Sequence, residues 1–182
     1  MSTMIDLVRT RRSIRSFTRE PVSPEHRALL TETLLRSPSS RGLNPWEFVL
    51  VDDLQLLEQL ARAKQHGSAF LKDAPLGIVI CGDPQRCDVW IEDCSIAAIL
   101  LQMSAHSLGL GSCWIQIRER THDSRMTSEE YIRRVLVIPD HLRVASVIAV
   151  GYPAIVREPL AADQLQYDKL MYNRYGEPLR PD

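Results

Sequence analysis

Three arginines and a serine stand within five positions near the start of the chain, in the stretch TRRSIRSF. In an extended backbone side chains alternate, so Arg11, Ser13 and Arg15 would lie on one side and Arg12 on the other. In a helix, Arg11 and Arg15 would still share a face. Guanidinium groups flanking a hydroxyl suit a phosphate, because arginine offers a planar fork of donors and keeps its charge. A solvated helix end is the alternative, and spacing alone favours neither.

A second polar group follows in RSPSSRGLNPWEFVLV, residues 36–51, where a helix is expected to give way to a strand. Small hydroxyl and amide side chains beside a glycine allow a backbone to approach a polar ligand closely. An ordinary connection between helix and strand has the same composition, and composition alone favours it. The residues concerned are Ser39, Ser40, Arg41, Gly42 and Asn44.

Histidines and cysteines supply no recognisable acid, base or metal site. The five histidines are scattered and form no Ser-His-Asp grouping; His106 is read as a packed or interface residue. The four cysteines form no CxxC pair, which argues against zinc or iron–sulfur ligation and favours buried free thiols. They are Cys81, Cys87, Cys94 and Cys113.

Composition limits the classes of protein that the chain can be. Its 182 residues are 45% hydrophobic and 25% charged, which predicts one globular domain spanning residues 1–182. A formal charge of -1 argues against a broad nucleic-acid-binding face. No stretch approaches the roughly 20 apolar residues of a membrane span, and the N-terminus has no apolar run of signal-peptide length. We therefore expect a cytoplasmic protein without nucleic-acid or membrane partners.

Helices and strands are expected to alternate around one sheet. Ser23 as N-cap and Pro24 at the first helical position mark the start of one helix. The apolar run APLGIVICGD predicts a strand that is buried on both faces. Helices are expected at about residues 3–10, 24–37, 54–65, 88–108 and 127–136, and strands at about 46–53, 74–83, 112–117 and 141–153.

The helix at 88–108 is apolar on more than one side, so it is either central to the core or shared with a partner subunit. Gly109 and Gly111 are expected to end it. In the last strand, alternation predicts two apolar faces. One would hold Leu142, Val144, Ile148 and Val150, and the other Ala145, Val147 and Ala149. The polar tail from about residue 157 is expected to wrap over this subunit or a neighbour.

Four stretches, taken together and in order, resemble the nitroreductase family of FMN-dependent oxidoreductases over nearly the whole chain. RRSIRSF looks like the family's flavin phosphate motif, and SPSSRGLNPWEFVLV like its second motif. AAILLQMSAHSLGLGSCWI resembles its long central helix and following turn, and VIAVGYPA its last core strand. The resemblance implies an α+β fold with a mixed β-sheet sandwiched by helices. It also implies a homodimer formed through the long helix, with FMN at the interface and the C-terminal tail exchanged or wrapped over the partner.

The resemblance further implies roles for individual residues. Arg11, Arg12 and Ser13 would bind the phosphate and ribityl end, while Arg15 would reach the N1 and O2 edge of the flavin ring and tune it. Arg157 would complete the phosphate site. The partner subunit would contribute Pro38, Ser39 and Ser40, and Asn44 stands where the family usually has a glutamine that binds the ribityl chain. Arg41 and Gly42 depart from the family pattern, and Arg41 adds a cation beside the cofactor.

The stretch CWIQI would cover the other flavin face, with a backbone amide near Gln116 or Ile117 directed at N5. Trp114, Ile115 and Gln116 are thus further cofactor candidates, although Trp114 suits a core position equally well. Cys113 is read as a small residue packed under the flavin. No side chain is assigned an acid or base role, since the chemistry would occur at flavin N5.

The implied reaction is electron transfer from NADH or NADPH to a small-molecule acceptor such as a nitro compound or quinone, in a ping-pong cycle. The segment RERTHDSRMTSEE is short, which predicts an open pocket without a long lid. One alternative is a flavoprotein of the same fold with another task, such as a dehydrogenase, a reductive dehalogenase or an FMN-consuming enzyme. Another is a nonenzymatic module that binds a phosphorylated ligand.

Overall fold

The computed structural model describes residues 3–178; the first two and last four residues of the predicted domain lie outside this range. Its centre is a four-stranded sheet in the order β1-β2-β4-β3, with every neighbouring pair antiparallel. The strands are β1 (Trp46–Val51), β2 (Leu76–Gly82), β3 (Gly111–Gln116) and β4 (Arg143–Gly151).

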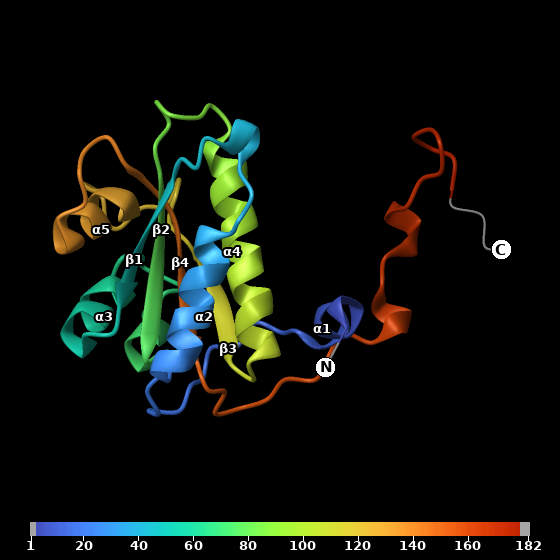
Figure 1. The fold of residues 1–182 in the computed structure, drawn as a ribbon, viewed down its shortest axis with the longest axis horizontal. Helices are drawn as coiled ribbons and strands as arrows, with labels where there is room; N and C mark the ends of the chain where they lie inside the picture. Colours follow the sequence, from blue (N-terminus) through green and yellow to red (C-terminus); the bar gives the residue numbers. More distant parts are fainter. Residues whose placement is uncertain (1–2, 179–182) are drawn as a thin grey trace.

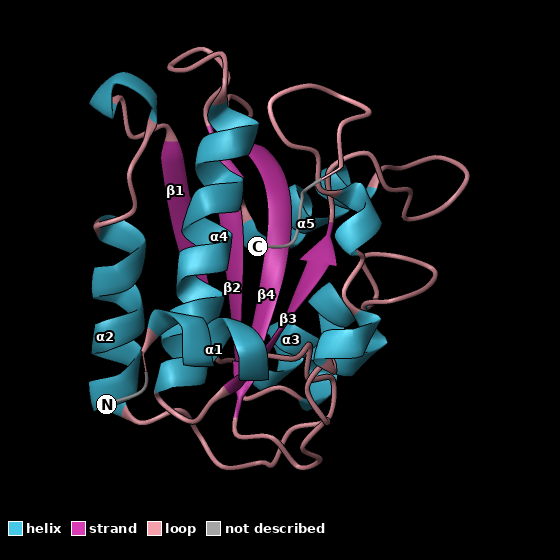
Figure 2. Ribbon diagram, turned by 90° about the vertical axis from the view of Figure 1, so that its right-hand side faces the viewer, coloured by secondary structure: helices cyan, strands magenta, loops and turns pink. Residues whose placement is uncertain are grey.

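Helices cover both faces of this sheet (Figures 1 and 2). On one face, α2 (Pro24–Leu35) and α4 (Trp90–Ser107) pack over a core that includes Leu30, Leu101 and Ile148. On the other, α3 (Leu54–Ala61) and α5 (Ser128–Leu136) cover a second core. The predicted α+β sandwich is confirmed, and β2 is buried along its whole length, as its apolar sequence predicts.

The four-stranded sheet is itself antiparallel, and the arginine segment adds one isolated parallel bridge at its β3 edge. After α1 (Met4–Thr10), the chain runs extended beside β3, where Ser13 and Ser112 form a parallel bridge. The Ile14 N–H donates to the Ser112 carbonyl at 2.9 Å. The segment therefore lies along β3 as a short extra strand, which decides between the extended and helical interpretations of TRRSIRSF.

Local signals place the helix starts correctly. The Ser23 hydroxyl accepts the His26 N–H at 3.1 Å, with Pro24 in the first turn of α2. The predicted end of α3 near residue 65 is wrong, because α3 stops at Ala61. There the Ser68 hydroxyl donates to the Ala61 carbonyl at 2.8 Å, and the chain turns at Gly67 with φ +81°. The carbonyl that another helical turn would use is thus already engaged.

The predicted faces of β4 are wrong for its first half. Ile80 pairs with Ser146 and Cys81 pairs with Val144, so Ala145 is an extra residue in a bulge. The bulge shifts the alternation by one position. Two groups of residues result: Leu142 and Val144 join Val147 and Ala149 beneath α3 and α5, whereas Ala145 joins Ile148 and Val150 beneath α2 and α4.

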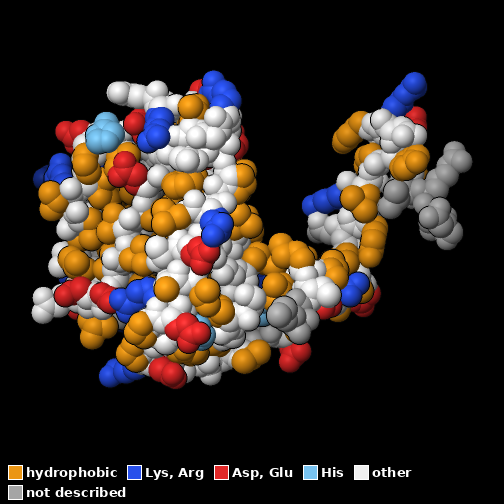
Figure 3. Space-filling model, in the orientation of Figure 1, with side chains coloured by type: hydrophobic (Ala, Val, Ile, Leu, Met, Phe, Trp, Pro, Cys, Tyr) orange, Lys and Arg blue, Asp and Glu red, His pale blue; other side chains and the backbone are white. Residues whose placement is uncertain are grey.

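The C-terminal tail stands away from the body of its own chain (Figures 1 and 3). It contains two short 3-10 helices, Ala162–Gln164 and Tyr167–Lys169, and residues 154–178 are exposed throughout. The tail therefore does not wrap over its own subunit, and its wrapping over a partner stays a prediction. None of the helices among residues 3–178 is long and apolar enough to cross a membrane.

Candidate functional site

The arginine segment is held against the sheet and against the end of α4. Thr10 Oγ1 lies 2.8 Å from His106 Nε2, near the C-terminal end of that helix. Gly109, with φ +75°, ends α4 as predicted. Gly111 does not end the helix but begins β3, and a Cβ placed on it would come within 2.8 Å of the Ile14 side chain. The absence of a side chain at Gly111 therefore permits the close approach of the segment.

A cavity of about 510 Å³ lies over this segment, and its polar lining is cationic. No carboxylate lines it, and within residues 3–178 no ion pair involves Arg11, Arg12, Arg15 or Arg157. Unpaired guanidinium groups beside a serine hydroxyl form a donor set suited to a phosphate dianion. The lining residues are Val8, Arg9, Arg11, Arg12, Ser13, Arg15, Arg157 and Leu160.

Arg15 connects this cavity to a second hollow. It lines both the cationic cavity and a cleft of about 880 Å³ that continues past Phe17 to Pro75. Its guanidinium carbon lies 5.9 Å from the centre of the Phe70 ring, a cation–π arrangement. Arg11 lines only the first of these two spaces. The geometry thus separates Arg15 from the other cluster arginines, although both Arg11 and Arg15 lie close enough to Cys113 to lower the pKa of its thiol.

Cys113 is a buried thiol on β3 close to these groups. It is 1% exposed, and burial raises the pKa of its thiol above the ordinary value, while Arg15, Ser13 and Arg11 act in the opposite direction. The thiol is therefore a protonated, small side chain at neutral pH. All four cysteines are buried and free, as predicted. Among residues 3–178, no three His, Cys, Asp or Glu side chains gather as a metal site.

The other candidates on β3 differ in what they can present to a ligand. Ile115 is 1% exposed and packs in the core, so only its backbone is available. Trp114 is half-buried, and its Nε1–H donates to Gln116 Oε1 at 3.0 Å. Gln116 in turn donates to the Arg118 carbonyl at 2.9 Å. The Ile117 amide donates to the Ala145 carbonyl at 3.3 Å, so it is already occupied.

The second polar group forms a closed loop between α2 and β1. The Ser39 hydroxyl donates to Asn44 Oδ1 at 2.7 Å and accepts the Asn44 N–H at 2.9 Å. A hydroxyl has a single proton, so Ser39 has none left to donate, whereas the Asn44 amide protons remain available. Ser40 donates its N–H to Asp93 Oδ1 at 2.8 Å. Pro38 is exposed at the start of the loop.

Arg41 does not project as a free cation from this loop. It pairs with Asp88, and its guanidinium lies 3.9 Å from Cys87 Sγ. Its backbone has φ 54°, followed by Gly42 at φ +65°. Positive φ explains why a glycine is suited to position 42, where a Cβ would meet open space but adopt a disfavoured conformation.

The two polar groups lie at opposite ends of α4 in one protomer. The loop is tied to Asp93 in the first turn, and the arginine segment to His106 in the last. At 1.5 Å per residue, about 20 Å of helix separates Asp93 from His106. One protomer therefore does not bring Ser39, Ser40 and Asn44 to the arginine cluster.

Sequence reasoning missed Asp93 and Phe70 as neighbours of these groups. Asp93 stands within an apolar helical pattern, and such an acid is a signal that it has a buried partner. Phe70 carries no comparable signal, because its position under Arg15 depends on the turn formed by residues 69–73.

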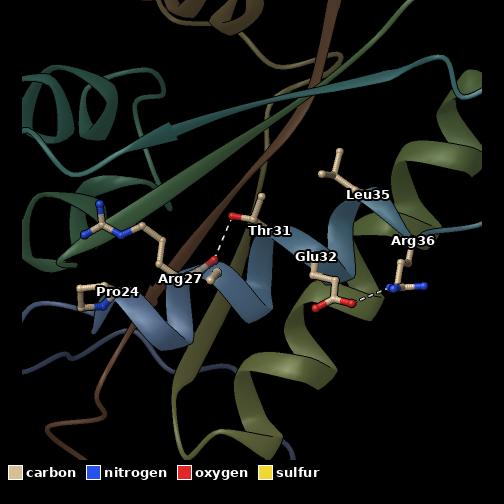
Figure 4. Close-up of a pocket in the computed structure, with 7 residues that line it drawn as sticks. Pro24, Arg27, Thr31, Glu32, Leu35 and Arg36 are labelled. Carbon is tan, nitrogen blue, oxygen red and sulfur yellow. Dashed lines mark hydrogen bonds and ion pairs between the residues drawn. The ribbon is translucent and has the colours of Figure 1, made fainter.

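A different hollow, of about 770 Å³, lies on the exposed side of α2 and contains none of the predicted site residues (Figure 4). Its charged groups are paired: Glu32 with Arg36 at 2.7 Å, and Arg27 with Asp52 at 2.6 Å. Thr31 donates to the Arg27 carbonyl at 2.9 Å. With its charges satisfied, this surface lacks the unpaired cations of the cluster over β3.

An α+β sandwich with an unpaired arginine cluster at one sheet edge has a donor set that suits a phosphate-bearing ligand. A family model described as the nitroreductase family matches residues 8–67 and 60–152. The chain belongs to the nitroreductase family.

Individual relatives agree with this assignment. An FMN-dependent nitroreductase from Clostridium difficile R20291 superposes with a TM-score of 0.92 at 41% identity, covering 94% of this chain and 99% of the other. Relatives described as candidate NADH dehydrogenase/NAD(P)H nitroreductases occur in Methanothermobacter thermautotrophicus and Archaeoglobus fulgidus. The first is 33% identical over 94% of this chain and 87% of its own length. The second is 32% identical over 90% of this chain and 92% of its own.

Proposed function

We propose that two copies of this chain bind FMN between them and transfer electrons from NADH or NADPH to small-molecule acceptors in a ping-pong cycle. Nitro compounds and quinones are the acceptors that we expect. Membership of the nitroreductase family and the names of its relatives support the oxidoreductase class and the choice of cofactor and donor. A cytoplasmic location stays a prediction.

The observation that carries the proposal is the unpaired arginine cluster in a cavity without carboxylates. Arg11, Arg12 and Arg157 would neutralise the phosphate dianion of FMN, and Ser13 would add a hydroxyl donor. The bound cofactor would supply two-electron chemistry that the side chains of this chain lack. The fit rests on charge: a dianion would neutralise the positive charges of the arginine cluster, which no carboxylate among residues 3–178 pairs.

Arg15 is proposed to act on the ring rather than on the phosphate. It lines both the cationic cavity and the cleft toward Pro75, near Cys113 and over the Phe70 ring. A fixed cation there stabilises negative charge that develops on the adjacent ring edge on reduction. Cys113, as a buried protonated thiol, would provide a small neutral surface beneath the ring.

The placement of the polar loop supports a two-chain site. Ile96 and Ile99 on α4 are 39% and 43% exposed. Three apolar side chains on α1 are exposed to a greater extent: Met4, Ile5 and Val8. An apolar helix face of this kind favours packing against a second copy. Antiparallel packing of two α4 helices would bring the Ser39–Asn44 loop of one chain to the arginine cluster of the other. We therefore propose that Ser40 and Asn44 donate to the flavin bound by the partner.

Cofactor uptake and reduction test the proposal directly. Purified protein should be yellow or become so with added FMN, and anaerobic NADPH or NADH should bleach its visible absorbance. Initial rates with varied donor and acceptor should give parallel double-reciprocal lines, as ping-pong kinetics require. Protein that binds no FMN would overturn the proposal and leave the nonenzymatic phospho-ligand module. Bound FMN that neither nucleotide reduces would instead favour a flavoprotein with another task.

A further inference from the structure

Asp93 is a buried carboxylate without an ion-pair partner. It is 2% exposed and stands in the first turn of α4. Within residues 3–178 it takes part in no ion pair, because Arg41 pairs with Asp88 instead. Burial of an unpaired charge is costly unless hydrogen bonds and a favourable local field offset it. The N-terminal end of a helix provides such a field. The groups that donate hydrogen bonds to the carboxylate then indicate its role.

Each carboxylate oxygen accepts a hydrogen bond from a different part of the chain. Oδ1 accepts the backbone N–H of Ser40 at 2.8 Å, and Oδ2 accepts the Cys87 thiol at 3.4 Å. Cys87 is itself 2% exposed and lies 3.9 Å from the Arg41 guanidinium. Asp93 thus joins the rigid long helix to both the loop after α2 and the turn that precedes α4.

The loop that Asp93 holds has a backbone that needs external support. Arg41 and Asn44 have φ values of 54° and 49°, in the left-handed region that residues with a side chain seldom adopt. Such residues persist where the surroundings fix them, and they concentrate at functional sites. Ser39 closes the loop from within through Asn44. Asp93 fixes it from the body of the protein through the Ser40 N–H, and Arg41 adds its pair with Asp88.

We propose that Asp93 is a positioning residue for flavin binding. Its carboxylate holds Ser40, and through Ser40 the loop of residues 39–44, in the shape that meets the flavin bound by the other chain. The inference rests on the proposed function, since it assigns the loop to the cofactor. It adds a residue that does not itself touch the cofactor.

Two substitutions and a matched control test this role in the full-length dimer. Asp93→Ala removes both acceptors and releases the loop, so the proposed contact of the loop with the flavin should be lost and FMN affinity should fall about tenfold, the worth of one hydrogen bond of that contact. Asp93→Asn retains an amide oxygen for the Ser40 N–H, so its affinity for FMN should lie between those of the wild type and of Asp93→Ala. Glu25→Ala removes an exposed acid from the first turn of α2, away from the loop, and should leave FMN affinity within about twofold of the wild type.

Hydrogen exchange and flavin circular dichroism separate positioning from general stabilisation. Ser40 amide exchange should accelerate in Asp93→Ala and recover in Asp93→Asn, and the dichroism of bound FMN should change in the same order. Equal FMN affinity in wild type and a folded Asp93→Ala would overturn the inference. The inference would also be overturned if both variants lost the same amount of FMN affinity and that loss followed their free energy of unfolding alone. If Asp93→Ala does not fold, the exchange rate of the Ser40 amide in Asp93→Asn, compared with that in the wild type, decides whether the side chain at position 93 holds the loop. Wild-type protein that binds no FMN would instead overturn the proposed function.

Discussion

Thr10 Oγ1 and His106 Nε2 lie 2.8 Å apart, and the Thr10 hydroxyl also lies 2.7 Å from the Asp6 carbonyl. The hydroxyl proton goes to Asp6, because a carbonyl can only accept, so His106 must donate through Nε2–H. The contact fixes the tautomer of a histidine that neighbours Arg11. Burial and then Arg11 lower the pKa of His106 below its ordinary value.

This lowered pKa predicts a dependence of stability on pH. The unfolded state takes up the His106 proton at a higher pH than the folded state, so the unfolded state binds more protons between the two pKa values. The free energy of unfolding should therefore fall as pH decreases through and below 6.5, the ordinary value. Denaturant titrations of FMN-free protein across this range should show the fall, and His106→Asn should reduce the slope. An unchanged slope in the variant would contradict the assignment to His106.

Gly111→Ala should damage both the fold and the site. The new Cβ would meet Ile14 at 2.8 Å and push the arginine segment away from β3. Overpacking of this kind costs about 1–3 kcal/mol, and FMN binding should weaken with it. Because Ile14 Cβ is itself one of the atoms at 2.8 Å, Ile14→Gly in the same chain removes the clash and should restore part of the binding. Thermal unfolding and FMN titration measure the two effects, and tight binding by Gly111→Ala alone would refute the close packing.

Arg11→Ala and Arg15→Ala should affect the cofactor in different ways. Loss of one charge-assisted contact to phosphate costs about 1.5–3 kcal/mol, so Arg11→Ala should weaken FMN binding about tenfold or more. Arg15→Ala should chiefly lower the flavin reduction potential, because it removes a cation from the ring edge. Titration of FMN and anaerobic potentiometry measure the two quantities. Equal shifts of the potential in both variants would contradict the division of roles.

Arg143 and Glu129 should matter for stability and not for cofactor binding. Glu129 accepts from Arg143 Nη2 at 2.9 Å and from the Val144 N–H at 3.3 Å, and its side chain is 8% exposed. Arg143→Ala would leave this carboxylate buried without its cation, at a cost of about 1–3 kcal/mol for a pair that is open to solvent on one side. Adding Glu129→Gln should recover part of the loss. Chemical denaturation checks both variants, and an additive loss in the double variant would exclude the pair.

Much of the fold follows from local signals in the sequence, and the exceptions have a common cause. Ser23 and Pro24 mark the start of α2 through contacts within one helical turn, which a sequence records directly. The bulge at Ala145 arises from how β4 meets β2, and the early end of α3 from a hydroxyl seven residues ahead. Both depend on contacts that reach beyond a single helical turn or strand, so periodicity within one element does not reveal them. The single domain spanning residues 1–182 stays a prediction.

The candidate site shows the same division. The spacing of Arg11, Ser13 and Arg15 predicts a shared side with Arg12 on the other, but Arg12 lines the same cavity as these three residues, so alternation does not separate it from them. That these arginines lack carboxylate partners is visible only once the chain is folded. The role of Asp93 is likewise hidden, since its partner Ser40 lies 53 positions earlier. Family resemblance, rather than residue chemistry alone, carried the assignment of the loop to the cofactor.

The position of the polar loop and the arginine cluster at opposite ends of α4 has a genetic consequence. In the proposed dimer, each flavin takes its cluster from one chain and its loop from the other. A chain with a defective cluster and a chain with a defective loop would each form homodimers in which both sites bind FMN weakly. In a dimer that contains one chain of each kind, one site combines the defective cluster with the defective loop. The other site combines the intact cluster with the intact loop. Coexpression of Arg11→Ala with Asp93→Ala should thus restore activity by complementation between two damaged copies.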